Sequence, residues 1–92
     1  MYDVKITVKS VKGFCSAGYK PGDHFYIRNG IMVEAGEPQG ICMYALPALL
    51  PYMTAFSRKT MPEDWINSKQ ELQCPDNTNS VAFGLERSEP EL

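Results

Sequence analysis

The longest apolar stretch of the chain runs from Gly40 to Arg58, and it most constrains what the chain can fold into. Its apolar side chains recur at every third or fourth position, which is typical of a helix with one buried side; they are Cys42, Ala45, Leu46, Leu49, Met53 and Phe56. Pro47 and Pro51 interrupt this pattern, since proline in a helix interior costs ~3 kcal/mol but costs little in the first turn. We therefore predict a short turn at 41–46 and a helix that starts near Pro47 or Pro51, with a kink between the prolines.

Strand-like runs precede this segment. Residues 2–9 alternate between apolar and polar side chains, which predicts a strand with one face in the core and one in water. The pair Asn29-Gly30 separates two runs that favour strands, and this is a strong hairpin signal. We predict a hairpin formed by residues 24–28 and 31–34.

A short helical turn and two further strands are predicted after the apolar stretch. Pro62 and the two acids after it predict a short helical turn at 62–67, with Trp65 and Ile66 against the core. Two more strands are expected at 71–74 and 80–87. The whole pattern predicts a small α+β fold, in which a curved, mostly antiparallel sheet of about five strands packs on the kinked helical segment.

The predicted organisation is a single compact domain at 1–87 with a frayed tail at 88–92. The net charge of −2 argues against a general nucleic-acid binder, which needs a basic surface. No apolar run approaches the ~18–20 residues of a membrane span, and the first residues lack the unbroken apolar core of a signal peptide. We expect a cytoplasmic protein without membrane contact that forms a homo-oligomer or binds a protein partner through sheet edges or apolar helix surface.

Three cysteines are the main candidates for chemistry, and each falls at the boundary of a predicted element. Cys15 lies in a glycine-rich loop, Cys42 at the helix entrance and Cys74 where a strand meets a turn. An odd number cannot form a fully paired disulfide framework. Three thiolates with one further ligand suit zinc or an iron–sulfur cluster, although the chain has no CxxC pair. The alternative is that the thiols pack as small apolar side chains.

Two other residues are candidates beside the cysteines. Cys42 near a helix N-terminus would have a stabilised thiolate, and His24 beside it would form an arrangement like that of an activated nucleophile. Asp23 and His24 are neighbours on a strand and point to opposite faces, so the acid cannot simply orient the histidine. Asp76, in the turn after Cys74, is a further candidate. A packed thiol is the competing interpretation of Cys42.

Several segments together resemble a small, largely uncharacterised prokaryotic family of about ninety residues with three characteristic cysteines. The matching pieces are VKITV at 4–8, Cys15 with Gly18–Asp23 and Phe25, Gly40–Cys42 with Ala45, Leu49 and Pro51, and Cys74–Asp76 with Val81, Phe83 and Glu86-Arg87. Cys15, Cys42 and Cys74 match the family's cysteines one by one. The resemblance implies that these cysteines act together, but it implies no particular metal, substrate or reaction.

Two functional hypotheses follow. The preferred one is a non-enzymatic accessory or binding domain. The second is a thiolate site at Cys15, Cys42 and Cys74 that holds zinc or an iron–sulfur cluster, or acts in redox chemistry. A small cysteine-dependent enzyme ranks third.

Overall fold

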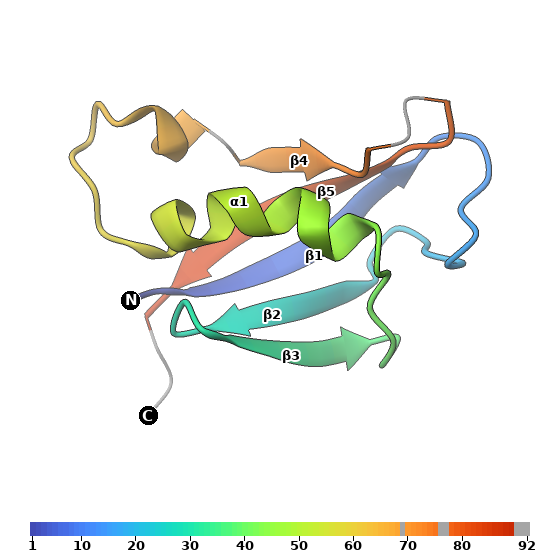
Figure 1. The fold of residues 1–92 in the computed structure, drawn as a ribbon, viewed down its shortest axis with the longest axis horizontal. Coiled ribbons are helices and arrows are strands. Elements are labelled where there is room, and N and C mark those ends of the chain that lie inside the picture. The colour runs from blue at the N-terminus through green and yellow to red at the C-terminus, as the bar shows by residue number, and fades with distance from the viewer. Residues whose placement is uncertain (69, 76–77, 90–92) are drawn as a thin grey trace.

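The computed structural model describes residues 1–68, 70–75 and 78–89 of the protein. Five antiparallel strands form one open sheet in the order β3-β2-β1-β5-β4, with helix α1 against it (Figure 1). The elements are β1 Asp3–Val11, β2 His24–Arg28, β3 Met32–Glu37, α1 Ala45–Ser57, the 3-10 helix η1 Trp65–Ser68, β4 Glu71–Gln73 and β5 Val81–Ser88. The predicted α+β class is confirmed.

The alternation of β1 places one set of its side chains in the core. Val4, Ile6 and Val8 are at most 3% exposed, and on β5 Phe83 and Leu85 lie opposite Val8 and Ile6. Because side chains of a strand alternate between its two faces, polar residues such as Lys5 occupy the other face. The core therefore lies on one side of the sheet.

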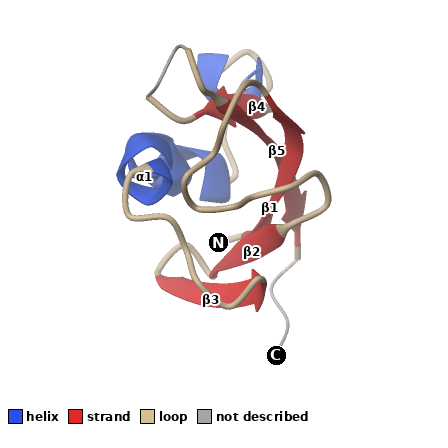
Figure 2. Ribbon diagram, turned by 90° about the vertical axis from the view of Figure 1, so that its right-hand side faces the viewer, coloured by secondary structure: helices blue, strands red, loops and turns tan. Residues whose placement is uncertain are grey.

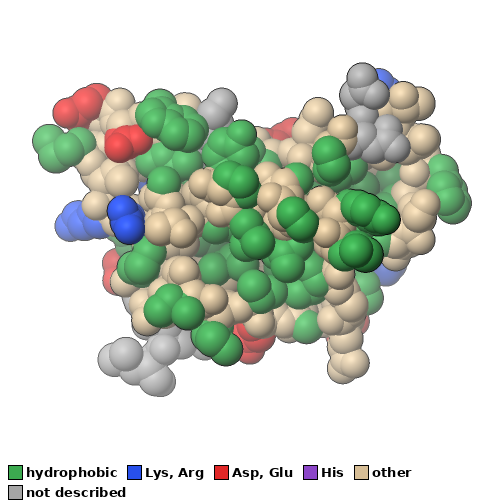
Figure 3. Space-filling view, in the orientation of Figure 1, with side chains coloured by type: hydrophobic (Ala, Val, Ile, Leu, Met, Phe, Trp, Pro, Cys, Tyr) green, Lys and Arg blue, Asp and Glu red, His purple; other side chains and the backbone are tan. Residues whose placement is uncertain are grey.

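Helix α1 covers this core face, as the view along the helix shows (Figure 2). Its side chains at Leu49, Met53 and Phe56 are at most 3% exposed, and they follow the spacing that the sequence predicted. Burial of each large apolar side chain stabilises the fold by about 1.5–3 kcal/mol. Apolar side chains also gather on the surface of this side of the molecule (Figure 3).

The predicted start of the helix was wrong. α1 begins at Ala45, and a turn in which the Leu46 amide donates to the Cys42 carbonyl across 3.1 Å leads directly into it. Pro47 is the third helical residue, where an amide would have no partner within the helix, so the ring causes no loss. Pro51 lies inside the helix without ending it.

The hairpin between β2 and β3 forms where Asn29-Gly30 predicted it. Both residues adopt positive φ, 52° and 70°, which few residues other than asparagine and glycine tolerate. The Ile31 amide donates to the Arg28 carbonyl across 3.1 Å. The second strand runs from Met32 to Glu37, so it starts one residue later and ends three residues later than predicted.

Two expectations for the second half need correction. Ile66 is buried at 1% exposure as predicted, but Trp65 is 60% exposed. The Trp65 and Tyr52 rings meet edge-on, with centroids 6.4 Å apart. Adjacent residues of a 3-10 helix point in different directions, so only one of the two can face the core. Ser88, assigned by prediction to the tail, pairs with Asp3, and residues 90–92 lie outside the described part. Within the described ranges, no helix has the length and apolar character to cross a membrane.

Candidate three-cysteine cavity

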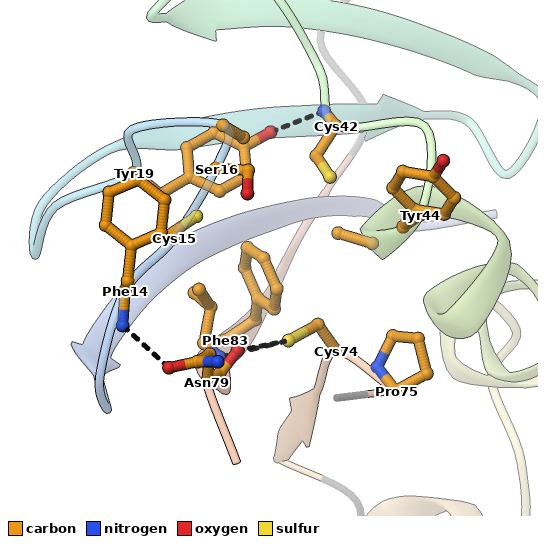
Figure 4. A pocket seen from close by; sticks show the side chains of 13 residues that line it. Phe14, Cys15, Ser16, Tyr19, Cys42, Tyr44, Cys74, Pro75, Asn79 and Phe83 are labelled. Carbon is orange, nitrogen blue, oxygen red and sulfur yellow. Dashed lines mark hydrogen bonds between the residues drawn. The ribbon is translucent and has the colours of Figure 1, made fainter. Parts of the chain in front are cut away.

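The three cysteines line one cavity at the end of the sheet where α1 begins (Figure 4). Cys15 comes from the loop between β1 and β2, Cys42 from the segment before α1, and Cys74 from the position directly after β4. All three are free thiols of intermediate exposure. The cavity has a volume of about 470 Å³.

The loop with Cys15 is tied to the end of the hairpin between β4 and β5. The Lys12 amide donates to the Ser80 carbonyl across 2.7 Å, and the Phe14 amide donates to Asn79 Oδ1 across 3.0 Å. These bonds join residues more than sixty positions apart in the chain. They hold two walls of the cavity together.

Cys74 is fixed by the strand pair that it ends. Its amide donates to the Val81 carbonyl across 3.0 Å, so the ladder continues one step past β4. In return the Val81 amide donates to Cys74 Sγ across 3.1 Å.

Tyr19 connects the segment that contains Cys42 to Phe83 on β5. Its ring meets the Phe83 ring edge-on, with centroids 5.9 Å apart, and its hydroxyl accepts the Cys42 amide across 2.8 Å. Burial raises the pKa of Tyr19; the Cys42 amide bond opposes this, and negative charge on Cys42 and Cys15 adds to it. Tyr19 therefore stays protonated at neutral pH, within electrostatic range of two of the three thiols. Sequence reasoning did not identify this bond.

The rest of the described lining is mostly apolar and carries no charged side chain. Phe14, Ala45, Val81 and Phe83 are among its walls, and Asn79 is one of its few polar groups. Sequence reasoning gave no role to Phe14 or Asn79. The glycine-rich character of the Cys15 loop was the only local signal near them.

The residues that the structure describes contain no group of three or more His, Cys, Asp or Glu placed to hold a metal ion. A tetrahedral zinc site needs its ligands to converge on one point, with Zn–S bonds of ~2.3 Å. The thiols instead stand around a hollow. The hypothesis of a shared zinc ion at Cys15, Cys42 and Cys74 thus finds no support in the described geometry.

His24 lies away from the cavity. Phe25 and Ile27 on β2 face the core, so His24 points to the opposite side of the sheet, where its ring meets the edge of Tyr26 at 5.6 Å. Its Nδ1 lies 3.1 Å from the Gly22 carbonyl. The suggested pairing of Cys42 with His24 is not formed. Asp76, the remaining candidate, lies outside the described residues.

No family model matches the chain, and the comparisons with curated proteins and with solved structures find no match either. The family resemblance drawn from the sequence motifs stays a prediction.

Proposed function

We propose that this protein is a small non-enzymatic binding domain whose three-cysteine cavity holds a small ligand. The observation that carries the proposal is that Cys15, Cys42 and Cys74, from three separate segments, line one cavity of about 470 Å³. Volumes of this order, with apolar walls and a few polar groups, are typical of small-molecule sites. The walls contribute apolar contact and the thiols contribute specificity.

The proposal assigns the thiols to binding rather than to catalysis. A cysteine nucleophile is normally activated by a base within hydrogen-bond reach. Among the described residues that line the cavity there is no His, Asp or Glu. The Val81 amide and the Tyr19 hydroxyl can donate hydrogen bonds, but neither can accept a proton from a thiol at neutral pH.

Thiol protection tests the proposal, with the apolar dye anilinonaphthalene sulfonate as the probe. Saturating dye should slow alkylation of all three cysteines together in the folded, reduced protein. Ala17→Trp should do the same without dye, because Ala17 is exposed at the cavity wall. Ala35→Trp is the matched control, since Ala35 is exposed on β3 and lines no part of this cavity. Dye that protects no cysteine, or only one, would overturn the proposal.

A cytoplasmic location and self-association complete the proposal. Reducing compartments keep cysteines as thiols, and a binding site made of thiols needs that state. Alkylation of the cysteines in intact cells before lysis would test this, and recovery of the protein as a disulfide would contradict it. Self-association is assigned to β3, which among the described strands has a neighbour on one side only.

A further inference from the structure

The geometry points to a four-iron, four-sulfur cluster as the ligand of the cavity, with Cys15, Cys42 and Cys74 as its three protein ligands. This inference rests on the proposed binding function. A cluster differs from a single ion in that each thiolate binds a different iron atom. Its ligands must therefore surround a volume, and they need not converge on a point.

The arrangement of the thiols agrees with that requirement. The three sulfurs come from three sides of the hollow and point into it (Figure 4). The same described residues offer no compact group for a single metal ion. A cluster does not need such a group, because its iron and sulfide would fill the space between the thiols.

The surroundings of the sulfurs also suit a cluster. Hydrogen bonds to ligand sulfurs and exclusion of water are two means by which proteins tune such centres. The Val81 amide already points at Cys74 Sγ across 3.1 Å. Phe83 is fully buried and Tyr19 is 7% exposed, so aromatic rings keep water from the inner side.

The fourth iron would carry an external ligand. No fourth Cys, and no His, Asp or Glu, is found among the described residues of the lining. The cavity is open on its outer side, where Tyr44 is 70% exposed and Phe14 is 73% exposed. A small thiolate or a group on a partner protein can reach the cluster from there.

Ligand exchange with a preformed cluster tests this without any added oxidant or reductant. The probe is a synthetic four-iron, four-sulfur cluster that carries four mercaptoethanol thiolates, mixed with the reduced protein under argon. Each cysteine thiol bonds an iron and gives its proton to a departing thiolate, so three mercaptoethanol molecules leave. The charge and oxidation state of the cluster stay unchanged. After gel filtration we expect one cluster per chain by iron and sulfide analysis, with visible sulfur-to-iron absorption.

The matched control keeps the number of thiols but moves one. Cys42→Ser combined with Ser68→Cys keeps three cysteines in the chain. Position 68 is suitable for the relocated thiol because Ser68 is exposed and lies outside the cavity. This variant, and each single Cys→Ala variant, should lose most of the bound iron while circular dichroism stays native. Equal iron in the wild type and the relocated variant would show adventitious binding and overturn the inference.

Two further outcomes separate this inference from the function on which it rests. If the wild type binds no cluster while the dye still protects all three thiols, the cluster is wrong and the binding domain stands. If the chain binds one zinc ion through the same three cysteines and refuses the cluster, the inference is also overturned. If neither dye nor cluster binds, both proposals fail.

Discussion

The main-chain amide of Cys42 donates a hydrogen bond to the hydroxyl of Tyr19 across 2.8 Å, between residues 23 positions apart in the chain. The Tyr19 ring in turn stands edge-on to Phe83 in β5. One buried side chain thus fixes the entrance of α1 relative to the sheet. The position of the Cys42 thiol depends on this contact, because the amide belongs to the same residue.

Tyr19→Phe should lower the free energy of unfolding by about 1–3 kcal/mol, since a partly buried amide loses its acceptor while the ring contact with Phe83 remains. Tyr44→Phe is the control, because Tyr44 is 70% exposed, and its change should stay within about 0.5 kcal/mol. Urea denaturation measures both. Equal losses in the two variants would contradict a structural role for the Tyr19 hydroxyl.

Asp23 should make stability depend on acid pH. The pKa of its carboxyl is held below 3.8, mainly by the hydrogen bond from the Lys20 amide and then by the Lys20 side chain. A carboxyl whose pKa is lower in the folded state than in the unfolded state stabilises the fold. This stabilisation is present at pH values above the unfolded-state pKa and is lost as the pH falls through the folded-state pKa. Asp23→Asn should therefore be less stable at neutral pH and lose less on acidification. The measurement is the Tm of the wild type and of Asp23→Asn from neutral pH into the acid range. If the two plots of Tm against pH run parallel, Asp23 does not cause the acid dependence.

Gly13 and Gly18 both adopt positive φ, 76° and 75°, so alanine at either position should cost about 1–2 kcal/mol of backbone strain. They differ in their surroundings. A Cβ on Gly13 would overlap Asn79 Oδ1, whereas a Cβ on Gly18 meets nothing within 4 Å. Gly13→Ala should thus be the less stable variant in urea, and it should also alkylate faster at Cys74. Similar stability and similar alkylation in both variants would mean that the Asn79 contact does not hold the two walls of the cavity together.

Arg87 stabilises the end of α1. Its Nε donates to the Phe56 carbonyl across 2.6 Å, and its guanidinium lies 4.0 Å from the centre of the Phe56 ring. Arg87→Met should cost about 1.5–3 kcal/mol, the range for hydrogen bonds that involve a charged group. Arg58→Met, at an exposed position directly after α1, should change stability by no more than about 0.5 kcal/mol. Guanidinium denaturation compares them, and the reverse order would remove Arg87 from this role.

Self-association through β3 has a closely matched pair of variants. Met32 on β3 is 65% exposed and Met61, outside the sheet, is 67% exposed. Because an unpaired strand edge can add a strand from a second copy, a charge at its surface should weaken the pairing. Met32→Lys should shift the protein toward monomer in size-exclusion chromatography with light scattering, while Met61→Lys should not. A wild type that is monomeric at every concentration would end this prediction.

The parts of the fold that the sequence predicted are those that depend on local pattern. Alternation in β1 determines which of its side chains face the core, and Asn29-Gly30 supports the positive φ that the β2–β3 turn needs. The helical stripe of α1 contains its buried residues except Ser57. Each of these signals lies within a window of about 11–18 residues of the chain.

The remaining features depend on contacts between distant residues. The start of α1 could not be read from Pro47 alone, because the preceding turn is held by Tyr19 through Cys42. The sequence placed the cysteines at element ends, but contacts between distant residues, such as the bond between Phe14 and Asn79, show which loops form the walls. Local periodicity contains no information on such pairs.

The pairing of β1 with β5 determines when, during synthesis of the chain, the cavity can form. β1 leads into the loop of Cys15, while β5 holds Cys74 through Val81. A nascent polypeptide leaves the ribosome from its N-terminus, so β1 cannot pair with β5 until the residues between them, and then β5 itself, have emerged. Whatever occupies the cavity must therefore arrive after translation has passed β5, and an incomplete polypeptide released before that point cannot capture it.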